Sequence, residues 1–279
     1  MGLIVDGKKI QYEKKGLLKN KIASFSDKLK LVVIQVGSDP AGMVYVKNKE
    51  RLCDEVGILF EHIKYDFIDE GDLICKIEEL NDDESVTGIL VQRPLPDNLD
   101  EKKVIEAISP LKDVDGLTSK NIGNLFAGND GIVPCTALGV MEILKNINVC
   151  LEGAKVAVVG RSKLVGLPLI GLLLEKNATV TVCHSKTDNL REITLSSDIV
   201  IVAIGRKGFI TSDYIKDDAV VIDVGINRED GKLYGDVAFD ELVNKCKYIT
   251  PVPGGVGPIT VVMLVNNVIK AYELQKSFN

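Results

Sequence analysis

The chain has 279 residues and carries 34 lysines and arginines against 40 aspartates and glutamates, a formal net charge of −6 at pH 7. Hydrophobic residues make up 46% and charged residues 27% of the sequence, which excludes a disordered or collagen-like chain and allows a sizeable core without disulfides. The negative charge argues against nucleic acid or an anionic membrane surface as a partner.

Neither the N-terminus nor the cysteines indicate export. Residues 1–6 contain no basic segment followed by an apolar one, so no signal peptide is expected. The longest apolar run, 167–174, is much shorter than the roughly 20 residues of a membrane-spanning helix. The six cysteines are scattered, with no C-x-x-C pair, and predict reduced thiols rather than disulfides or a zinc site. We therefore expect a cytoplasmic α/β protein.

The first half of the chain alternates short apolar runs with amphipathic segments. Strands are expected over 31–36, 60–65 and 88–92, and helices over 41–56 and 72–80. This order, with strands of the fully buried type, predicts a parallel sheet, which the prolines at 94 and 96 end because proline cannot donate to a strand ladder. The earlier lysine-rich stretch 8–30 is interleaved with apolar residues, which favours an amphipathic surface helix over a binding patch.

A loop-rich stretch from 109 to 131 indicates a domain boundary near its end, and a helix is expected after Pro134. The alternation then restarts. Strands are expected over 155–159, 179–183, 198–203 and 219–223, a helix over 164–176, a loop over 250–260 and a closing helix over 261–275. The sequence therefore predicts a two-lobed α/β protein. Its N-terminal α/β domain comprises residues 1–133 and 260–279, its second domain comprises 134–259, and a cleft lies between them.

A glycine turn follows the strand at 155–159, where a dinucleotide-binding fold carries its G-x-G-x-x-G fingerprint. Gly160 holds the first glycine position, but Ser162 and Val165 occupy the second and third. What remains is the strand, the tight turn and a helix N-terminus whose free N–H groups favour an anion. On this motif alone, an ordinary β–α turn stays an open alternative.

The end of the next strand bears on the choice of cofactor. NAD-binding proteins usually carry an acidic residue there, about 20 residues past the turn, which holds the ribose 2′-hydroxyl. This chain has Ser185, Lys186 and Thr187 instead, with no carboxylate before Asp188. Together with Arg161, these side chains favour a 2′-phosphate, and therefore NADP over NAD.

Small residues follow two further strands of the second block, within 203–206 and 223–227. In an open parallel sheet, the cofactor lies in the crevice above such strand ends. The predicted fold of this domain is therefore a Rossmann-like doubly wound parallel sheet. The predicted cofactor-binding residues are Gly160, Arg161, Ser162, Val165, Ser185, Thr187, Gly205 and Ile226.

Polar side chains of the first block are candidates for chemistry. Tyr45 and Lys49 are four residues apart on an expected helix and share a face, although the spacing alone favours a solvated lysine beside a half-buried tyrosine. Gln92 closes a buried strand, where a polar side chain commonly faces the crevice above the sheet. Asp113 and Asp115 precede a glycine, so a structural turn is the default, and no third oxygen-rich motif supports a metal site.

In chain order, the motifs resemble those of the methylenetetrahydrofolate dehydrogenase/methenyltetrahydrofolate cyclohydrolase family, in its bacterial single-chain two-domain form. The resemblance covers essentially the whole chain. The motifs are Gly37-Ser38-Asp39-Pro40, Tyr45-Val46-x-x-Lys49, Gly88-Ile89-Leu90-Val91-Gln92-x-Pro94-Leu95-Pro96, Lys112-Asp113-Val114-Asp115-Gly116, Pro134-Cys135-Thr136, Gly160-Arg161-Ser162 with Val165-Gly166, Asp223-Val224-Gly225-Ile226-Asn227-Arg228, and the proline–glycine block from Thr250 to Pro258.

The resemblance implies two reactions. The first is NADP-dependent oxidation of 5,10-methylenetetrahydrofolate to 5,10-methenyltetrahydrofolate, and the second is hydrolysis to 10-formyltetrahydrofolate. It assigns Lys49 as the general acid/base, oriented by Gln92. Tyr45 would pack on the folate and help to place Lys49, and Asp115 would accept from the pterin N–H groups. The substrate-binding residues it implies are Tyr45, Gln92, Asp115, Pro253, Gly254 and Gly255. It further implies a folate substrate, one-carbon metabolism that supplies purine biosynthesis, and a homodimer formed through the second domain.

Four positions depart from the family's usual residues: Arg93 stands where leucine is common, Ala137 where proline is frequent, Gly42 where serine is common, and Leu167 where lysine is frequent. None removes a catalytic group, but Arg93 beside Gln92 would alter the field on Lys49. Two other functions stay open at this point. One is a dehydrogenase that uses NAD and lacks the second activity, and the other is a cofactor-sensing binding protein without turnover. The intact set of Tyr45, Lys49, Gln92 and Asp115 argues against a sensor.

Overall fold

A computed structural model describes residues 2–277, which form two compact units. The three-stranded unit, named for its sheet, comprises residues 13–135 and 261–277. The six-stranded unit comprises residues 2–12 and 136–260. Among the described residues, no helix has the length and apolar character needed to cross a membrane. All six cysteines are free thiols.

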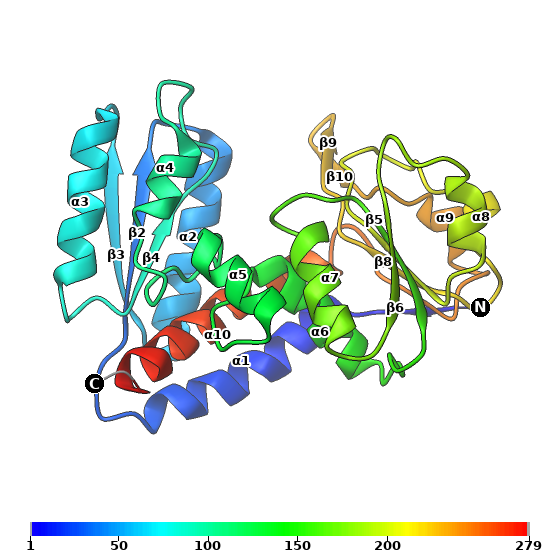
Figure 1. The fold of residues 1–279 in the computed structure, drawn as a ribbon, viewed down its shortest axis with the longest axis horizontal. Coiled ribbons are helices and arrows are strands. Elements are labelled where there is room, and N and C mark those ends of the chain that lie inside the picture. The colour runs from blue at the N-terminus through cyan, green and yellow to red at the C-terminus, as the bar shows by residue number, and fades with distance from the viewer. Residues whose placement is uncertain (1, 278–279) are drawn as a thin grey trace. The chain divides into compact units, whose positions relative to one another are not determined.

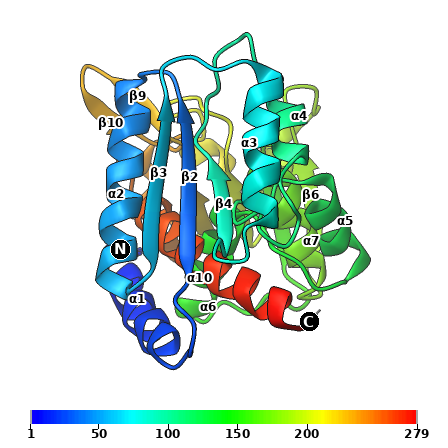
Figure 2. The ribbon, with the colours of Figure 1, turned by 90° about the vertical axis from the view of Figure 1, so that its left-hand side faces the viewer.

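The three-stranded unit is built around a parallel sheet in the order β3-β2-β4, which Figure 2 shows with β2 in the middle. Helices α2 and α3 cover opposite faces of this sheet (Figure 1). The elements are β2 (Lys30–Val36), α2 (Pro40–Val56), β3 (Leu59–Tyr65), α3 (Glu70–Asp82), β4 (Gly88–Val91), α4 (Glu101–Glu106) and α5 (Ser119–Ala127), with the larger parts of α1 (Gly7–Ala23) and α10 (Val256–Ser277). The expected strands and helices of this half are therefore present.

The core of this unit follows from the alternation of side chains along its strands. Val32 and Ile34 of β2 point to one face, where they pack with Leu73 and Ile77 of α3 and with Val104 of α4. All five side chains are fully buried. This packing fixes the carboxyl end of β4, where Gln92 lies.

The stretch 109–131, expected to be loop, contains the helix α5. The Thr118 side chain accepts a hydrogen bond from the Asn121 N–H at its start, and Gly128, in the left-handed conformation, ends it. These capping residues were visible in the sequence, but the helix is only nine residues long and its apolar stripe is short.

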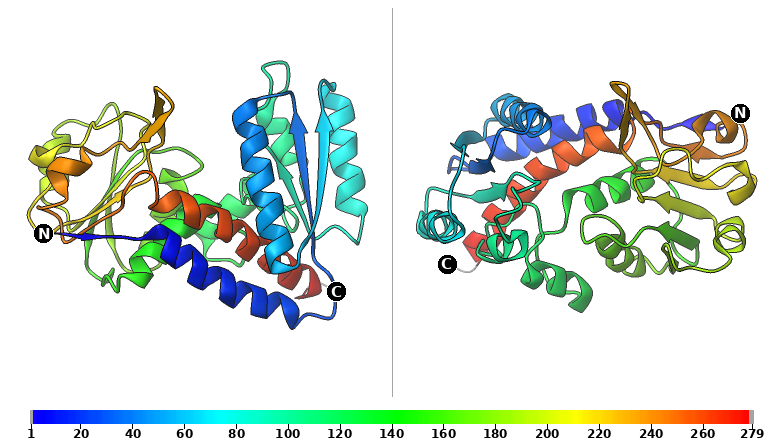
Figure 3. Two further views of the ribbon diagram at one scale, coloured as in Figure 1. Left: turned by 180° about the vertical axis from the view of Figure 1, so that it is seen from behind. Right: turned by 90° about the horizontal axis from the view of Figure 1, so that it is seen from above.

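The closing helix α10 begins at Val256 rather than at the expected 261. Pro258 falls in its first turn, where the missing N–H costs no intrahelical hydrogen bond, so the proline that suggested a loop is compatible with a helix. In the three-stranded unit, residues 13–23 of α1 lie alongside α10 (Figure 3), and Lys21 Nζ pairs with Glu273 Oε1 at 2.6 Å.

The six-stranded unit has a fully parallel sheet in the order β1-β11-β8-β7-β5-β6. Its strands are β1 (Leu3–Ile4), β5 (Lys155–Val159), β6 (Thr179–Cys183), β7 (Ile199–Val202), β8 (Val220–Asp223) and β11 (Tyr248–Ile249). Its other elements are α6 (Cys135–Asn146), α7 (Gly166–Leu174), α8 (Leu190–Leu195), α9 (Phe239–Leu242), a 3₁₀ turn (Ser212–Tyr214) and the hairpin β9 (Asn227–Glu229) with β10 (Lys232–Tyr234). Because β6 lies on one side of β5, and β7 and β8 lie on the other, the strand order reverses at β5. The predicted doubly wound Rossmann-like sheet is confirmed.

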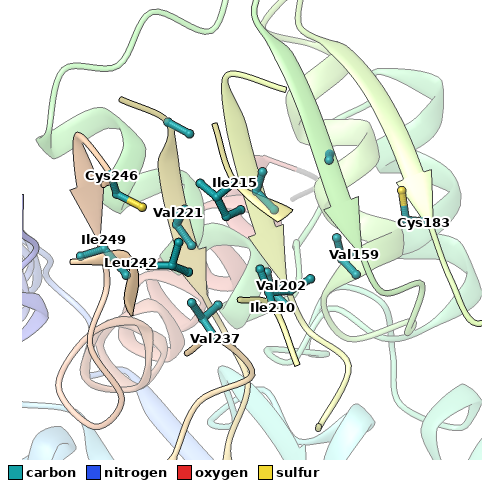
Figure 4. Packing of buried hydrophobic residues seen from close by; sticks show 13 residues of the cluster. Val159, Cys183, Val202, Ile210, Ile215, Val221, Val237, Leu242, Cys246 and Ile249 are labelled. Carbon is teal, nitrogen blue, oxygen red and sulfur yellow. The ribbon is translucent and has the colours of Figure 1, made fainter. Parts of the chain in front are cut away.

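The interior of this sheet is apolar. Val159, Val202 and Val221, from three neighbouring strands, pack with Ile210 and Leu242 of the covering segments (Figure 4). All five are buried. This core holds the carboxyl ends of β5, β7 and β8 in register, since Val159 is paired with Val202, and Val202 with Asp223.

Residues 2–12 belong to the six-stranded unit, whereas the sequence placed them in the N-terminal domain. The reason is an edge pairing that local pattern does not reveal: Leu3 is paired with Tyr248, and Ile4 with Ile249. Immediately after this strand, the Gly7 N–H donates to the Gly254 carbonyl at 3.0 Å. A two-residue strand is too short for its periodicity to be recognised in the sequence.

Candidate active site

In the three-stranded unit, α2 brings Lys49 to the carboxyl end of β4. Lys49 Nζ donates to Gln92 Oε1 at 2.6 Å, and Gln92 Nε2 donates to the Arg93 carbonyl at 2.7 Å. The Gln92 backbone N–H is itself bound to the Ile34 carbonyl at 2.8 Å, which continues the sheet. Because the amide nitrogen of Gln92 is occupied, its oxygen is the atom presented to the lysine.

The surroundings of Lys49 disfavour a full positive charge. Burial lowers the pKa of its ammonium, Asp115 and Cys135 oppose that change, and the Arg93 guanidinium adds to it. Arg93 in turn lies 3.6 Å from an oxygen of Asp115 and 3.7 Å from one of Glu101. A lysine with a lowered pKa can exchange a proton closer to neutral pH than a solvated one.

The structure brings Gln92 and Asp115 into this group but leaves Tyr45 more open. Tyr45 lies one helical turn before Lys49 and is 46% exposed, so its ring is available for stacking. The Asp115 side chain is 28% exposed, whereas Asp113 is buried. Asp113 accepts from the N–H groups of Gly116 at 2.9 Å and Thr118 at 2.8 Å. Asp113 therefore shapes the turn, as the Asp-Gly dipeptide predicts, whereas Asp115 keeps a partly exposed carboxylate.

Asn267 of α10 is a residue of this site that sequence reasoning missed. It is buried and donates to the carbonyls of Val114 at 2.9 Å and Val133 at 2.8 Å, and it lies 3.4 Å from Cys135 Sγ. It thereby holds the peptide immediately before Asp115. An asparagine among the apolar residues of the expected closing helix was the available signal, because buried amides need partners.

In the six-stranded unit, Gly160 turns the chain at the end of β5. Its φ is +127°, and a Cβ there would lie 2.3 Å from the Ala203 carbonyl oxygen, so only glycine fits. A Cβ on Gly166 would lie 2.1 Å from the Gly160 oxygen. The glycine that lets the helix approach the strand is thus Gly166, one residue after Val165, the position at which the fingerprint expects it.

The residues around this turn are open to an anion. Arg161 and Ser162 are exposed, and Ser162 supports the turn by accepting from the Leu167 N–H at 3.0 Å and the Val165 N–H at 3.3 Å. Val165 precedes α7 and gives no side-chain cap. The Leu167 N–H is already bound to Ser162 and Pro168 has no N–H, so these two residues of the first turn offer no donor to a phosphate.

The loop after β6 adds one exposed hydroxyl, that of Ser185. Thr187 is less free, since its Oγ1 accepts from the His184 N–H at 2.8 Å and closes the loop. Ser185 and Arg161 follow neighbouring strands, whose last residues, Cys183 and Val159, are paired. These two residues are thus the best placed of the predicted set for a 2′-phosphate.

Two further strand-end loops carry the remaining predicted cofactor residues. Gly205, with φ +65°, is exposed after β7, and Ile226 is 54% exposed after β8.

The residues of the predicted substrate-binding block differ in their exposure. Pro253 is exposed, whereas Gly255 is buried, and a Cβ on it would lie 2.6 Å from the Pro251 oxygen. Gly255 therefore has a packing reason to be glycine, whatever it binds.

The parallel sheet with a glycine turn at its reversal point defines this chain as a dinucleotide-binding α/β enzyme with a second unit that carries an ionisable cluster. The model "Tetrahydrofolate dehydrogenase/cyclohydrolase, catalytic domain" matches residues 5–115, and "Tetrahydrofolate dehydrogenase/cyclohydrolase, NAD(P)-binding domain" matches residues 134–276. The chain belongs to the tetrahydrofolate dehydrogenase/cyclohydrolase family.

Known proteins similar to this chain agree along its length. "Bifunctional protein FolD" of Lachnoclostridium phytofermentans is 49% identical over 276 residues, which cover 96% of this chain and 97% of that protein. The crystal structure of the bifunctional enzyme FolD from Campylobacter jejuni has a TM-score of 0.94 and 43% identity, and the match covers 99% of this chain and 100% of that one. The Trypanosoma brucei dehydrogenase-cyclohydrolase, solved with NADP cofactor and an inhibitor, has a TM-score of 0.92 and 34% identity over 99% of this chain and 98% of that one.

The protein is therefore a bifunctional enzyme of one-carbon metabolism. It oxidises 5,10-methylenetetrahydrofolate to 5,10-methenyltetrahydrofolate with NADP⁺ and hydrolyses the product to 10-formyltetrahydrofolate. The residues of the six-stranded unit fit NADP, because the exposed cation Arg161 and the exposed hydroxyl of Ser185 follow neighbouring strands and could hold a 2′-phosphate.

Proposed function

We propose that Lys49 is the general acid/base of the hydrolytic step and that Gln92 orients it. The observation that supports this role is the 2.6 Å hydrogen bond from the part-buried Lys49 ammonium to Gln92 Oε1. Addition of water to the methenyl cation releases a proton, and ring opening requires one at a ring nitrogen. One group with a lowered pKa can serve both needs in turn.

The oxidation makes different demands. A hydride leaves the carbon between two nitrogens, and the cation left behind is delocalised over both, so no proton acceptor is needed. NADP⁺, when bound, accepts that hydride. The chain's own contribution is alignment: Tyr45 would pack on the folate ring, and Asp115 would accept from the pterin N–H groups, with its carboxylate held near Arg93 at 3.6 Å.

For the cofactor, we assign the phosphates to the turn from Gly160 to Ser162 and to the backbone that follows it up to Val165. The 2′-phosphate falls to Arg161 and Ser185, and Thr187 shapes their loop. Gly205 and Ile226 would line the remainder, and Pro253, Gly254 and Gly255 would contact the substrate. The exposure of Arg161, Ser185 and Ile226 supports this division.

Replacement of Lys49 by alanine tests the proposal. Methenyl hydrolysis should fall by about 10²–10⁴-fold, the usual contribution of a general acid/base, while hydride transfer should fall less. The assay follows reduced cofactor and methenyl product at separate wavelengths, with NADP⁺ and NAD⁺ in parallel. Retained hydrolysis with lost hydride transfer would reverse the assignment, and a clear NAD⁺ preference of the wild type would refute the 2′-phosphate site.

We further propose that the enzyme is a cytoplasmic homodimer formed through the second domain and that its product supplies purine biosynthesis. The six free thiols support a reducing compartment. Light scattering coupled to size exclusion would test the oligomeric state, and a monomer at micromolar concentration would contradict it.

A further inference from the structure

Asp236 is a fully buried carboxylate in the six-stranded unit, just after β10. Its Oδ2 accepts from the N–H groups of Ile204 at 2.7 Å and Gly205 at 3.0 Å. Its Oδ1 accepts from the Arg206 N–H at 2.7 Å and from Asn227 Nδ2 at 2.9 Å. One side chain thus collects three successive backbone N–H groups of the loop after β7 and one amide from the segment after β8.

A second buried carboxylate, Asp223 at the end of β8, anchors the segment that carries Asp236. Asp223 accepts from the N–H groups of Asp236 at 3.0 Å, Val237 at 3.0 Å and Gly225 at 2.9 Å. Burial raises the pKa of Asp223 to about 6, against the effect of these three backbone hydrogen bonds. The two carboxylates link the loops after β7 and β8 through one connected set of hydrogen bonds.

Glycines leave the space that these carboxylates occupy. A Cβ on Gly225 would lie 2.1 Å from Asp236 Cγ, and a Cβ on Gly235 would lie 1.8 Å from an oxygen of Asp223. The backbone is therefore packed directly on both charges. Such a tightly bonded charge is costly to remove, because the N–H groups would lose their acceptors inside the protein.

The loop that Asp236 holds is the one next to the glycine turn. The Ala203 N–H donates to the Val159 carbonyl at 2.8 Å, and the Ala203 oxygen occupies the place that a Cβ on Gly160 would take. The N–H groups of 204–206 point inward to the carboxylate, so they are not donors to a bound phosphate. The backbone donors of this loop are therefore not available to an anion, and the loop after β7 presents the exposed Gly205 beside the exposed Arg206 side chain, whose guanidinium lies 4.3 Å from the centre of the Phe209 ring.

We propose that Asp236 is a positioning residue for NADP: it fixes the loops that carry Gly205 and Ile226 by consuming their inward-facing donors. This inference rests on the proposed cofactor-binding role of those two residues. Asp236 touches neither cofactor nor substrate in this assignment.

The test is direct binding of NADP⁺ to the full-length protein by titration calorimetry, without folate, so that no turnover occurs. Asp236→Asn keeps the shape of the side chain but replaces one carboxylate oxygen by an amide NH₂. This change removes two of the four hydrogen bonds and places the amide N–H groups against the N–H groups that the oxygen had accepted from. The Kd for NADP⁺ should rise by about tenfold, the scale of one or two lost charge-assisted hydrogen bonds. The cofactor-independent hydrolysis of methenyltetrahydrofolate should change much less.

Asp198→Asn is the matched control. Asp198 also accepts a backbone hydrogen bond, from the Lys155 N–H at 2.8 Å, but it directly precedes β7 and so lies at the amino ends of the strands, away from the loops that follow their carboxyl ends. Asp198→Asn should leave the Kd for NADP⁺ unchanged, even if the melting temperature of the variant falls.

A milder variant decides the matter if Asp236→Asn does not fold. Asn227→Ala removes one of the four hydrogen bonds to Asp236 and should raise the Kd by about threefold. A folded Asp236→Asn protein that binds NADP⁺ like the wild type would overturn the inference, as would an unchanged Kd in Asn227→Ala when Asp236→Asn is unfolded. Failure of the wild type to bind NADP⁺ would instead refute the proposed cofactor site.

Discussion

The two units prepare for chemistry in opposite ways. In the three-stranded unit, the proposed site consists of polar and ionisable side chains, with the part-buried Lys49 bound to Gln92 and its pKa affected by Arg93 and Asp115. In the six-stranded unit, the proposed site is mostly backbone, with Gly160 at the turn and the N–H groups of 204–206 bound to Asp236, and its charged side chain is the exposed Arg161. Proton transfer needs a group whose charge can change, whereas holding a dinucleotide needs surfaces that do not move. The following variants should therefore separate the two activities.

The largest effect is expected from Gly160→Ala. The added methyl group would meet the Ala203 oxygen at 2.3 Å in a backbone conformation with φ +127°. We expect the Kd for NADP⁺ to rise by about 100-fold through displacement of the turn, with methenyl hydrolysis largely retained. Binding titration and the hydrolysis assay measure the two effects.

Gly153→Ala is the control for that variant. Gly153 also has a positive φ, +74°, but nothing lies within 4 Å of its added Cβ. It should lower stability by about 1 kcal/mol and leave the Kd for NADP⁺ unchanged. Equal loss of NADP⁺ binding in both variants would mean that backbone strain, rather than the collision with Ala203, is responsible.

The next largest effect is expected from Gln92→Leu. It removes the acceptor of the part-buried Lys49 ammonium, so hydrolysis should fall by about tenfold or more, while the Kd for NADP⁺ should not change. Gln92→Glu gives the complementary result, since a carboxylate raises the pKa of Lys49 and should move the pH–rate profile of hydrolysis to higher pH. If the pH–rate profile of Gln92→Glu is the same as that of the wild type, Gln92 has no part in the proton transfer.

Arg161→Ser should change the choice of cofactor. Loss of the exposed guanidinium should raise the Kd for NADP⁺ by about tenfold and leave that for NAD⁺ nearly constant. The titration is done with both cofactors at two salt concentrations, because the contact with a 2′-phosphate is screened by salt. Parallel loss of both cofactors would place Arg161 at a shared part of the dinucleotide instead.

The smallest effect is expected from Arg93→Leu. Arg93 lowers the pKa of Lys49 and lies beside Asp115, whose carboxylate raises it, so removal of Arg93 should raise the pKa of Lys49. If hydrolysis requires the neutral amine, the rate at pH 7 should fall slightly and the profile should shift to higher pH. Arg51 lies on α2, the helix of Lys49, and its side chain is 80% exposed, so Arg51→Leu should not shift the pH–rate profile. A shift to lower pH would contradict the electrostatic argument.

Local pattern was sufficient for most of the fold but not for its short elements. The strands at 155–159 and 179–183 have the expected bounds, because each run is short, rich in β-branched residues and bounded by turn signals, which favours a strand over a helix. The helix α5 and the strand β1 were missed. The first is brief and capped within a glycine-rich stretch, and the second is a strand only because β11 lies beside it.

The same division holds for the sites. Motifs identified Lys49, Gln92 and Gly160, since residue type and order suffice for such patterns. They did not identify Asn267 or Asp236, whose partners are 153 residues and about 30 residues away in the chain. The fingerprint spacing also put its third glycine position at residue 165, a valine, whereas the glycine that packs against the strand is Gly166. A spacing rule does not contain the position at which the helix meets the strand.

The sequence by itself thus determined the parallel α/β architecture, the family and the residues that carry charge. Only the tertiary structure decided which charges are paired. Burial, which lowers the pKa of Lys49 and surrounds Asp236 with N–H groups, is a property of neighbours brought together by folding. Hydrophobic periodicity is encoded locally along the chain, whereas the electrostatic state of a buried group depends on what folding places around it.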